Sequence, residues 1–281
     1  MSVYPTECSM PELPEVEVIA RGLDLLLRGQ TIEAVEVLWP GAIATPAPAA
    51  FAASLLGRRF LRVGRRGKFL VLSLDDGRYL MAHLRMTGTF CVAPAERCPE
   101  RFVRVVFRLA NGWQLQFADM RKFGRLYLVD QISQATGVLG PEPLGADFTP
   151  EQLGAMLAGR RSAIKPLLLN QRFIAGLGNI YVDEALFRAG IHPLRCASSL
   201  IPEEVCRLWE AIQTVLSLAI SHHGTTLSAY RDAEGRRGEN QNHLLVYGRK
   251  GESCARCGGI IQRIVVSQRG THFCPRCQPA A

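Results

Sequence analysis

Four cysteines near the end of the chain have the spacing of metal ligands. Cys254 and Cys257 form CARC, Cys274 and Cys277 form CPRC, and sixteen residues separate the two pairs. Four thiolates in this arrangement can converge tetrahedrally on one Zn²⁺ and leave no position open for chemistry. We therefore expect one structural zinc ion. The alternative, a redox CxxC motif or two unrelated pairs, is disfavoured because redox motifs occur singly in a βαβ context.

The segment between the two cysteine pairs, IIQRIVVSQRGTHF, has β character on both sides of a turn. It predicts two strands of a zinc ribbon whose folding is coupled to metal binding. The other five cysteines lack ligand-like spacing, and we expect free thiols in a reducing compartment. These five are Cys8, Cys91, Cys98, Cys196 and Cys206.

A glycine pair stands between two helical patterns in NQRFIAGLGNIYVDEAL. Gly176 and Gly178 precede a helix for which Asn179 is the expected N-cap, and free backbone N–H groups there would bind phosphate. A dinucleotide-binding motif does not fit, because a helix precedes the pair and the third glycine is missing. A glycine-rich turn without a ligand explains the motif equally well when it is taken alone.

Basic and apolar residues alternate in the first half of the chain. RRFLRVGRRGK, from Arg58 to Lys68, holds six basic residues and indicates either a solvated edge or a nucleic-acid contact. HLRMTG and DMRKFG each end a strand-like run and place Met86, Arg121 and Phe123 near turns. Taken singly, Met86 and Phe123 also fit a hydrophobic core.

The elements that would position these residues fall into two groups. Alternating, β-rich segments separated by the turns DDG and NG run from Leu61 to about Val129, and Glu15–Leu27 has helical periodicity. A glycine- and proline-rich stretch from Gly137 onward is the linker candidate. Helical patterns then cover 151–157, 162–170, 179–189 and 202–222.

Composition sets broad limits on the class of protein. The chain has 281 residues, of which 48% are hydrophobic, so it can bury a substantial core. A net charge of +8 suits a polyanionic partner such as nucleic acid. We expect no membrane association and a cytoplasmic location, because apolar runs are short and the N-terminus lacks a secretory pattern.

The order of motifs from Met10 to Gln278 resembles the formamidopyrimidine-DNA glycosylase family, called Fpg or MutM. The motifs are PELPEVE, RRGKFL, HLRMTG, DMRKFG, LGPEPLG, AIKPLLLNQRFIAGLGNIYVDEALFRAGIHP, HGTTL, VYGRKGESC and QRGTHFCPRCQ. The resemblance implies an α+β fold with an N-terminal β-sandwich-like domain and helix, a helix-two-turn-helix domain and a zinc ribbon. It also implies a monomer acting on double-stranded DNA that contains damaged bases or abasic sites, associated with the nucleoid. The predicted segments are 1–10, 11–136, 137–150, 151–243 and 244–281.

The resemblance also implies the chemistry: a bifunctional glycosylase and β,δ-elimination lyase that removes oxidised purines through a Schiff base. Pro11 matches the nucleophile, Glu12 the proton donor to the deoxyribose and Glu15 a supporting carboxylate. Lys68 and Arg269 match residues that contact phosphates and donate protons during elimination. A charged helix N-terminus, stabilised by the helix dipole, is the alternative explanation for the two glutamates.

Further positions match DNA contacts of the family. Met86, Arg121 and Phe123 match residues that fill the space left by an extruded base, and Arg161 and Asn179 match additional contacts. The loop GRRGENQNHLLVYG departs from the family pattern, because Glu239 and Asn240 stand where an aromatic residue is common.

Pro11 can act as a nucleophile only if its nitrogen is a free amine, since within a continuous chain it is an amide. We therefore expect an active form that begins at Pro11, with the segment from Met1 to Ser9 either not translated or removed, and Met10 as the alternative start. Three other functions compete with this one: an endonuclease VIII-like glycosylase for oxidised pyrimidines, a non-catalytic lesion-binding protein, and a generic zinc-ribbon DNA binder.

Overall fold

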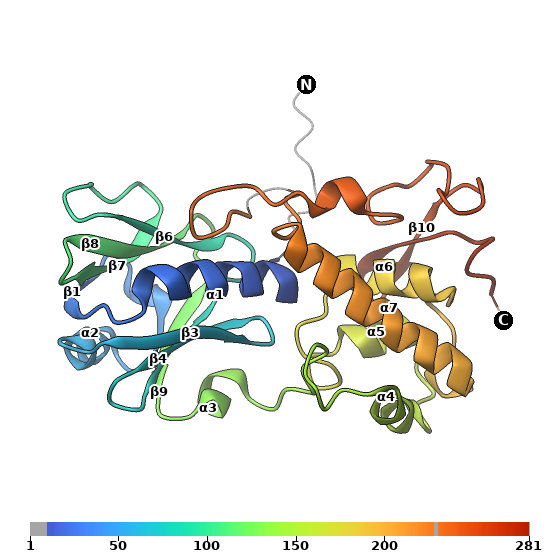
Figure 1. Cartoon of the computed structure of the whole chain (residues 1–281), viewed down its shortest axis with the longest axis horizontal. Coiled ribbons are helices and arrows are strands. Elements are labelled where there is room, and N and C mark those ends of the chain that lie inside the picture. The colour runs from blue at the N-terminus through green and yellow to red at the C-terminus, as the bar shows by residue number, and fades with distance from the viewer. Residues whose placement is uncertain (1–9, 228–229, 281) are drawn as a thin grey trace. The chain divides into compact units, whose positions relative to one another are not determined.

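The computed structural model describes residues 10–227 and 230–280, which form two compact units (Figure 1). Unit 1 contains the chain up to Val138 together with His222–Gln241. Unit 2 contains Leu139–Ser221 and the chain from Asn242 onward. Cys8 and the segment predicted to be absent from the active form, Met1 to Ser9, lie outside the described residues.

Unit 1 opens with the predicted amphipathic helix, α1 (Leu13–Leu27). Its apolar side chains recur every three or four residues, and Val16, Leu23 and Leu27 are completely buried. Pro14 is tolerated because the first turn needs no backbone donor. The helix packs on β3 (Phe60–Arg66) and β4 (Phe69–Leu74).

Two mainly antiparallel sheets make up the rest of the unit. One has the order β1-β7-β8-β6, and the other β2-β9-β5-β4-β3, in which only β2 and β9 pair in parallel. This confirms the predicted β-sandwich-like domain. The remaining elements of this unit are β1 (Ile32–Val37), η1 (Pro40–Ala42), β2 (Ile43–Thr45), α2 (Pro48–Leu55), β5 (Tyr79–His83), β6 (Gly88–Pro94), β7 (Val103–Leu109), β8 (Trp113–Asp119), β9 (Arg125–Val129) and α3 (Ile132–Thr136).

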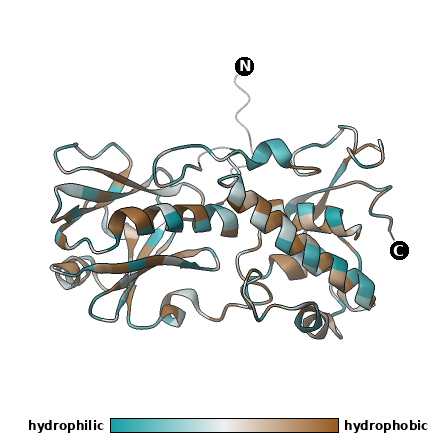
Figure 2. Ribbon diagram, in the orientation of Figure 1, coloured by the Kyte–Doolittle hydropathy of each residue, from teal (hydrophilic) through white to brown (hydrophobic). Residues whose placement is uncertain are grey.

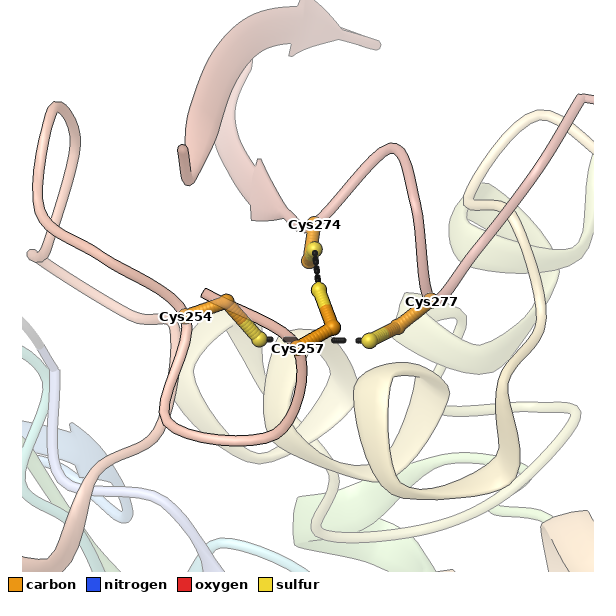
Figure 3. Close-up of side chains that lie close together, drawn as sticks. All are labelled: Cys254, Cys257, Cys274 and Cys277. Carbon is orange, nitrogen blue, oxygen red and sulfur yellow. Dashed lines mark hydrogen bonds between the residues drawn. The ribbon is translucent and has the colours of Figure 1, made fainter. Parts of the chain in front are cut away.

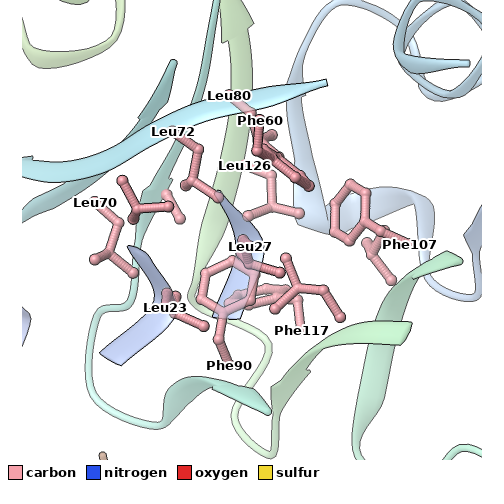
Figure 4. Close-up of a cluster of buried hydrophobic side chains, with 14 of the residues drawn as sticks. Leu23, Leu27, Phe60, Leu70, Leu72, Leu80, Phe90, Phe107, Phe117 and Leu126 are labelled. Atoms are coloured by element: carbon pink, nitrogen blue, oxygen red, sulfur yellow. The ribbon is translucent and has the colours of Figure 1, made fainter. Parts of the chain in front are cut away.

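One hydrophobic core joins α1 to both sheets (Figure 4). Leu23 from the helix, Phe60 from one sheet and Phe117 from the other all belong to this core. Tyr230 and Ala233 belong to the same core, which explains why residues 222–241 group with unit 1. The sequence had placed this stretch in the helical segment 151–243, because its own pattern is irregular and its packing partners are distant in sequence.

Unit 2 is helical, with α4 (Pro150–Leu157), α5 (Ile164–Leu169), α6 (Asn179–Ala189), η2 (Ala197–Ser199) and α7 (Pro202–Ser221). Hydrophobic and hydrophilic residues alternate along α7, as its predicted amphipathic pattern requires (Figure 2). The helix α5 is shorter than the predicted 162–170, because Ala163 forms a β-bridge with Cys196 before the helix begins. None of the described helices is long and apolar enough to cross a membrane.

The stretch predicted as a linker, 137–150, is largely bound to unit 2. Gly140 N–H donates to Gln171 O at 2.9 Å, and Ala175 N–H donates to Pro141 O at 3.0 Å. The indole N–H of Trp209 donates to Phe148 O at 2.7 Å. Unit 2 also includes part of η3 (Asn240–His243) and ends in the predicted hairpin of β10 (Gln262–Val266) and β11 (Arg269–Phe273).

Candidate functional site

The first turn of α1 holds two buried carboxylates beside a buried proline. Glu12 is 3% exposed, Glu15 is 2% exposed, and Pro11 precedes them in the same buried stretch. Glu12 N–H donates to Glu15 Oε2 at 2.9 Å, and Thr225 N–H donates to Glu15 Oε1 at 2.8 Å. Charged side chains are rarely buried without such partners. A mere solvated helix end therefore does not describe these glutamates.

The loop that follows α7 contains Thr225, which donates to Glu15, and also Asn240, whose side-chain amide is buried. Asn240 is 6% exposed, and its Nδ2 donates to Thr225 Oγ1 at 2.8 Å. Its Oδ1 lies 3.3 Å from His222 Nδ1. Asn240, which stands where the family commonly has an aromatic residue, is thus part of a polar network that leads to Glu15.

The basic residues between Arg58 and Lys68 differ in their ion-pair partners and in their burial. Arg65 Nε lies 3.1 Å from Glu17 Oε2, and Arg58 lies 3.9 Å from two aspartates of the turn between β4 and β5. Both arginines are thus engaged by carboxylates of unit 1, although the side chain of Arg65 is only 9% exposed and that of Arg58 is 39% exposed. Lys68, at the turn between β3 and β4, is also buried and is only 7% exposed.

His83 is a buried histidine near Lys68 that the sequence analysis did not single out. It is 7% exposed on β5, opposite Phe69 of β4, and its ring packs edge-on against that phenyl ring at 4.6 Å. Burial, together with the charges of Arg85 and Lys68, lowers the pKa of His83 to about 3. A neutral imidazole therefore lies near Lys68. The position of His83 at the end of the apolar strand YLMAHL could have indicated that this histidine is buried.

The loops with Met86, Arg121 and Phe123 project from one end of the sandwich. Met86 is half-buried, whereas the phenyl ring of Phe123 is 48% exposed and so is not a core residue. The guanidinium of Arg121 lies 4.9 Å above that ring, within range of a cation–π interaction. Arg121 and Phe123 thus form an exposed stack.

In unit 2, the side chain of Asn179 is hydrogen-bonded to a backbone carbonyl of β11. Asn179 Nδ2 donates to Gly270 O at 2.9 Å, and the neighbouring Arg269 is exposed. The N-cap prediction for Asn179 was wrong: Gly178 is the N-cap, and Asn179 is the first helical residue. Its side chain serves the hairpin and not its own helix. Arg161 is exposed between α4 and α5.

The four ribbon cysteines converge as their spacing predicts (Figure 3). The Sγ atoms of Cys254 and Cys277 are 3.9 Å apart, those of Cys257 and Cys274 are 3.5 Å apart, and all four lie within 4.8 Å of one another. A tetrahedron of sulfur atoms at about 2.3 Å from Zn²⁺ has edges of about 3.8 Å. The cluster therefore fits one zinc ion and leaves no coordination position for a substrate. The four other cysteines in the described residues are free thiols.

The chain matches three family models in order along its length. They are the formamidopyrimidine-DNA glycosylase N-terminal domain (residues 10–126), the formamidopyrimidine-DNA glycosylase H2TH domain (139–231) and the zinc finger found in FPG and IleRS (251–280). These matches confirm the predicted fold, in which a helix-two-turn-helix domain and a zinc ribbon follow the N-terminal domain.

Relatives and solved structures agree with these models. A formamidopyrimidine-DNA glycosylase of Herpetosiphon aurantiacus is 50% identical over 96% of this chain and 100% of its own length. A mutant of the Lactococcus lactis enzyme, solved with DNA containing Fapy-dG, has a TM-score of 0.90 at 38% identity, covering 96% of this chain and 100% of that one. The wild-type Lactococcus lactis Fpg (MutM), solved with DNA containing an oxidised pyrimidine, has a TM-score of 0.89 at 39% identity and the same coverage. The chain belongs to the formamidopyrimidine-DNA glycosylase family.

Proposed function

We propose that this chain is a base-excision repair enzyme that removes oxidised purines from duplex DNA and then cleaves the resulting abasic site. Its substrates would be 8-oxoguanine and formamidopyrimidines, and its two activities those of a DNA glycosylase and a β,δ-elimination lyase. One observation carries the proposal: Glu12 and Glu15 are buried beside Pro11 at the first turn of α1. Membership of the glycosylase family supports it.

The glycosylase step assigns the nucleophile to Pro11. Its secondary amine attacks C1′, the bond to the base breaks, and the base leaves with a proton. Glu12 protonates the deoxyribose ring oxygen as the ring opens, which leaves an iminium between Pro11 and C1′. A terminal amine has a reference pKa of ~7.7–8.0, so part of it is unprotonated at neutral pH. Glu15, held by Thr225, keeps the helix start in position.

The lyase step consists of two eliminations from the iminium. Loss of a proton from C2′ breaks the C3′–O bond and releases the 3′ phosphate, and a second elimination breaks the C5′–O bond. The product is a one-nucleotide gap. We assign contacts with the flanking phosphates and proton donation to Lys68 and Arg269, and further phosphate contacts to Arg161 and Asn179.

Extrusion of the target base must precede attack on C1′, and it costs a few kcal/mol of stacking and pairing energy. We assign occupation of the resulting space to Met86, pairing with the orphaned base to Arg121 and wedging of the duplex to Phe123. The exposure of the Arg121–Phe123 stack supports this assignment, because an apolar wedge has to reach the base stack.

The proposed active chain begins at Pro11, since the amide formed with Met10 has no available lone pair. Borohydride reduction of a mixture with abasic-site DNA should trap a covalent complex with protein that begins at Pro11. Protein that retains Met1 to Met10 should give none. Glu12→Gln should retain binding but lose excision, whereas Glu17→Gln, which alters a carboxylate paired with Arg65, serves as the matched control.

Equal trapping by both forms, with the extension verified by mass spectrometry, would assign the nucleophile to another amine. Binding of lesion-containing DNA without any trapping by the Pro11 form would instead support a non-catalytic lesion-binding protein. Either result contradicts the role given to Pro11.

Oxidised pyrimidines are the second candidate substrate, because the Lactococcus lactis enzyme was solved with DNA that contains one. Asn240 adds a polar side chain where the family commonly has an aromatic residue, and this substitution bears on which base the site prefers. Comparing the release of 8-oxoguanine and thymine glycol from the same duplex decides between them. We further propose that the enzyme is cytoplasmic and acts as a monomer. Sedimentation with and without DNA tests the oligomeric state.

A further inference from the structure

Two loops of unit 1 lie side by side because the strands that flank them pair with each other. Residues 84–87 join β5 to β6, and residues 120–124 join β8 to β9. His83 at the end of β5 pairs with Arg125 at the start of β9. Gly88 at the start of β6 pairs with Asp119 at the end of β8. The two loops, called here the paired loops, therefore cross between the same two sheets at the same end.

The carboxylate of Asp119 ties the paired loops to each other. Asp119 is 1% exposed, and its Oδ1 accepts a hydrogen bond from the hydroxyl of Thr87 on the first loop. Arg121 N–H lies 3.1 Å from the same Oδ1 and 3.1 Å from Thr87 Oγ1. Gly124 N–H donates to Oδ2 at 2.7 Å. One buried carboxylate thus holds both ends of the second loop and a side chain of the first.

Two glycines permit this close packing. A Cβ on Gly124 would lie 2.7 Å from the phenyl ring of Phe117 and 3.1 Å from Asp119 Oδ2. A Cβ on Gly88 would lie 2.5 Å from the carbonyl oxygen of Leu84. A side chain at Gly88 would therefore displace the backbone of Leu84 in the first loop, and one at Gly124 would displace Phe117 and crowd the carboxylate of Asp119.

We propose that Asp119 and Thr87 are positioning residues that make the paired loops one rigid unit. Hydrogen bonds to a carboxylate are stronger than neutral ones, so the buried tie resists separation of the loops. Met86 on one loop and the Arg121–Phe123 stack on the other then enter the duplex together. This inference rests on the proposed function, because it concerns extrusion of the damaged base.

The tie should matter more for base excision than for cleavage at an abasic site. Excision from a duplex requires a stacked and paired base to leave the helix, and the loops must hold the space open. At a preformed abasic site no base has to be expelled. The ratio of the two rates therefore separates loop positioning from a general loss of structure.

The test compares three threonine variants in protein that begins at Pro11. Thr87→Val keeps the shape and removes the hydroxyl, Thr87→Ser restores it, and Thr89→Val is the matched control two residues along β6. Single-turnover excision of 8-oxoguanine should slow about tenfold in Thr87→Val, with abasic-site cleavage changed by less than about twofold. Thr87→Ser and Thr89→Val should behave as the unchanged protein does.

Asp119→Asn provides a second variant should Thr87→Val unfold, and thermal unfolding of each variant verifies the fold. An unchanged ratio of the two rates in Thr87→Val or Asp119→Asn, with the unchanged protein active, would overturn this inference alone. So would an equal loss of both rates. Failure of the unchanged protein to perform either reaction would contradict the proposed function and this inference with it.

Discussion

The ammonium of Lys165 lies 2.6 Å from Oδ1 of Asp183, and both side chains are completely buried in unit 2. Lys165 Nζ also donates to Gly270 O at 3.1 Å and to Thr271 Oγ1 at 2.8 Å. Asp183 Oδ2 accepts from His272 N–H at 2.8 Å. Because Gly270 O also accepts from Asn179, one buried charge pair links α5, α6 and the start of β11.

Removing the cation of this pair should strongly destabilise the protein. Lys165→Met keeps most of the side-chain volume but leaves the carboxylate of Asp183 buried without its partner, which typically costs about 3–5 kcal/mol. Urea unfolding measures the change in the free energy of unfolding. Adding Asp183→Asn to Lys165→Met should recover part of the loss. A single variant as stable as the unchanged protein would show that the pair contributes nothing.

Loss of one zinc ligand should weaken DNA binding as well as metal binding. Cys254→Ala leaves three thiolates, and the hairpin that carries Arg269 loses its support. Native mass spectrometry should find one zinc ion in the unchanged protein and in Cys206→Ala, a control that alters a free cysteine of α7. Native protein without a bound metal ion would contradict the site.

Lys68→Ala and Arg269→Ala should each weaken binding to abasic-site DNA and flatten its salt dependence. A lost phosphate contact reduces the slope of log K against log salt concentration by about 1. Binding titrations at several salt concentrations measure the slope. Arg58→Ala, which removes a surface charge facing aspartates, is the control. Unchanged slopes in both variants would refute the phosphate contacts.

Local patterns predicted much of the fold and the metal site. The spacing of Val16, Ile19 and Leu23 predicted a helical face, and all three are buried, whereas Leu26, placed on the same face, is 40% exposed. Two CxxC pairs separated by a short hairpin form a ligand set whatever the rest of the chain does. The alternation of apolar residues likewise predicted the β-rich half. These signals are contained within short segments, so no knowledge of distant contacts was needed.

Distant contacts explain what the sequence analysis did not predict. Asn179 is a residue type that commonly caps helices, but its side chain donates to the carbonyl of Gly270, ninety-one residues later in the sequence. The loop around Tyr230 packs on α1 through a core that no local pattern reveals. The tie between Asp119 and Thr87 depends on the pairing of β6 with β8. Each of these contacts is a property of the tertiary fold.

Met86→Ala separates a role in DNA from a role in the core. A fully buried methionine typically contributes about 2–5 kcal/mol relative to alanine, but Met86 is only half-buried. We expect a smaller loss of stability together with clearly slower excision of 8-oxoguanine. Met81→Ala, which truncates a methionine completely buried on β5, is the control and should show the full loss. An equally large drop in melting temperature for Met86→Ala would favour a core role.

Acid should destabilise the protein partly through His83. Because burial lowers the pKa of His83 from 6.5 to about 3, the unfolded chain binds a proton between these pH values and the folded chain does not. The free energy of unfolding therefore falls as the pH drops below about 6.5, by about 2 kcal/mol between pH 7 and pH 5 from this residue alone.

His83→Gln keeps an acceptor for the N–H of Arg85, which donates to His83 Nδ1 at 3.1 Å, but cannot titrate. Urea unfolding at pH 7 and pH 5 should show a smaller pH dependence for His83→Gln than for the unchanged protein. The carboxylates titrate alike in both proteins, so the difference isolates the imidazole. Identical pH dependence would mean that His83 is accessible to protons in the folded state, against its burial at the end of β5.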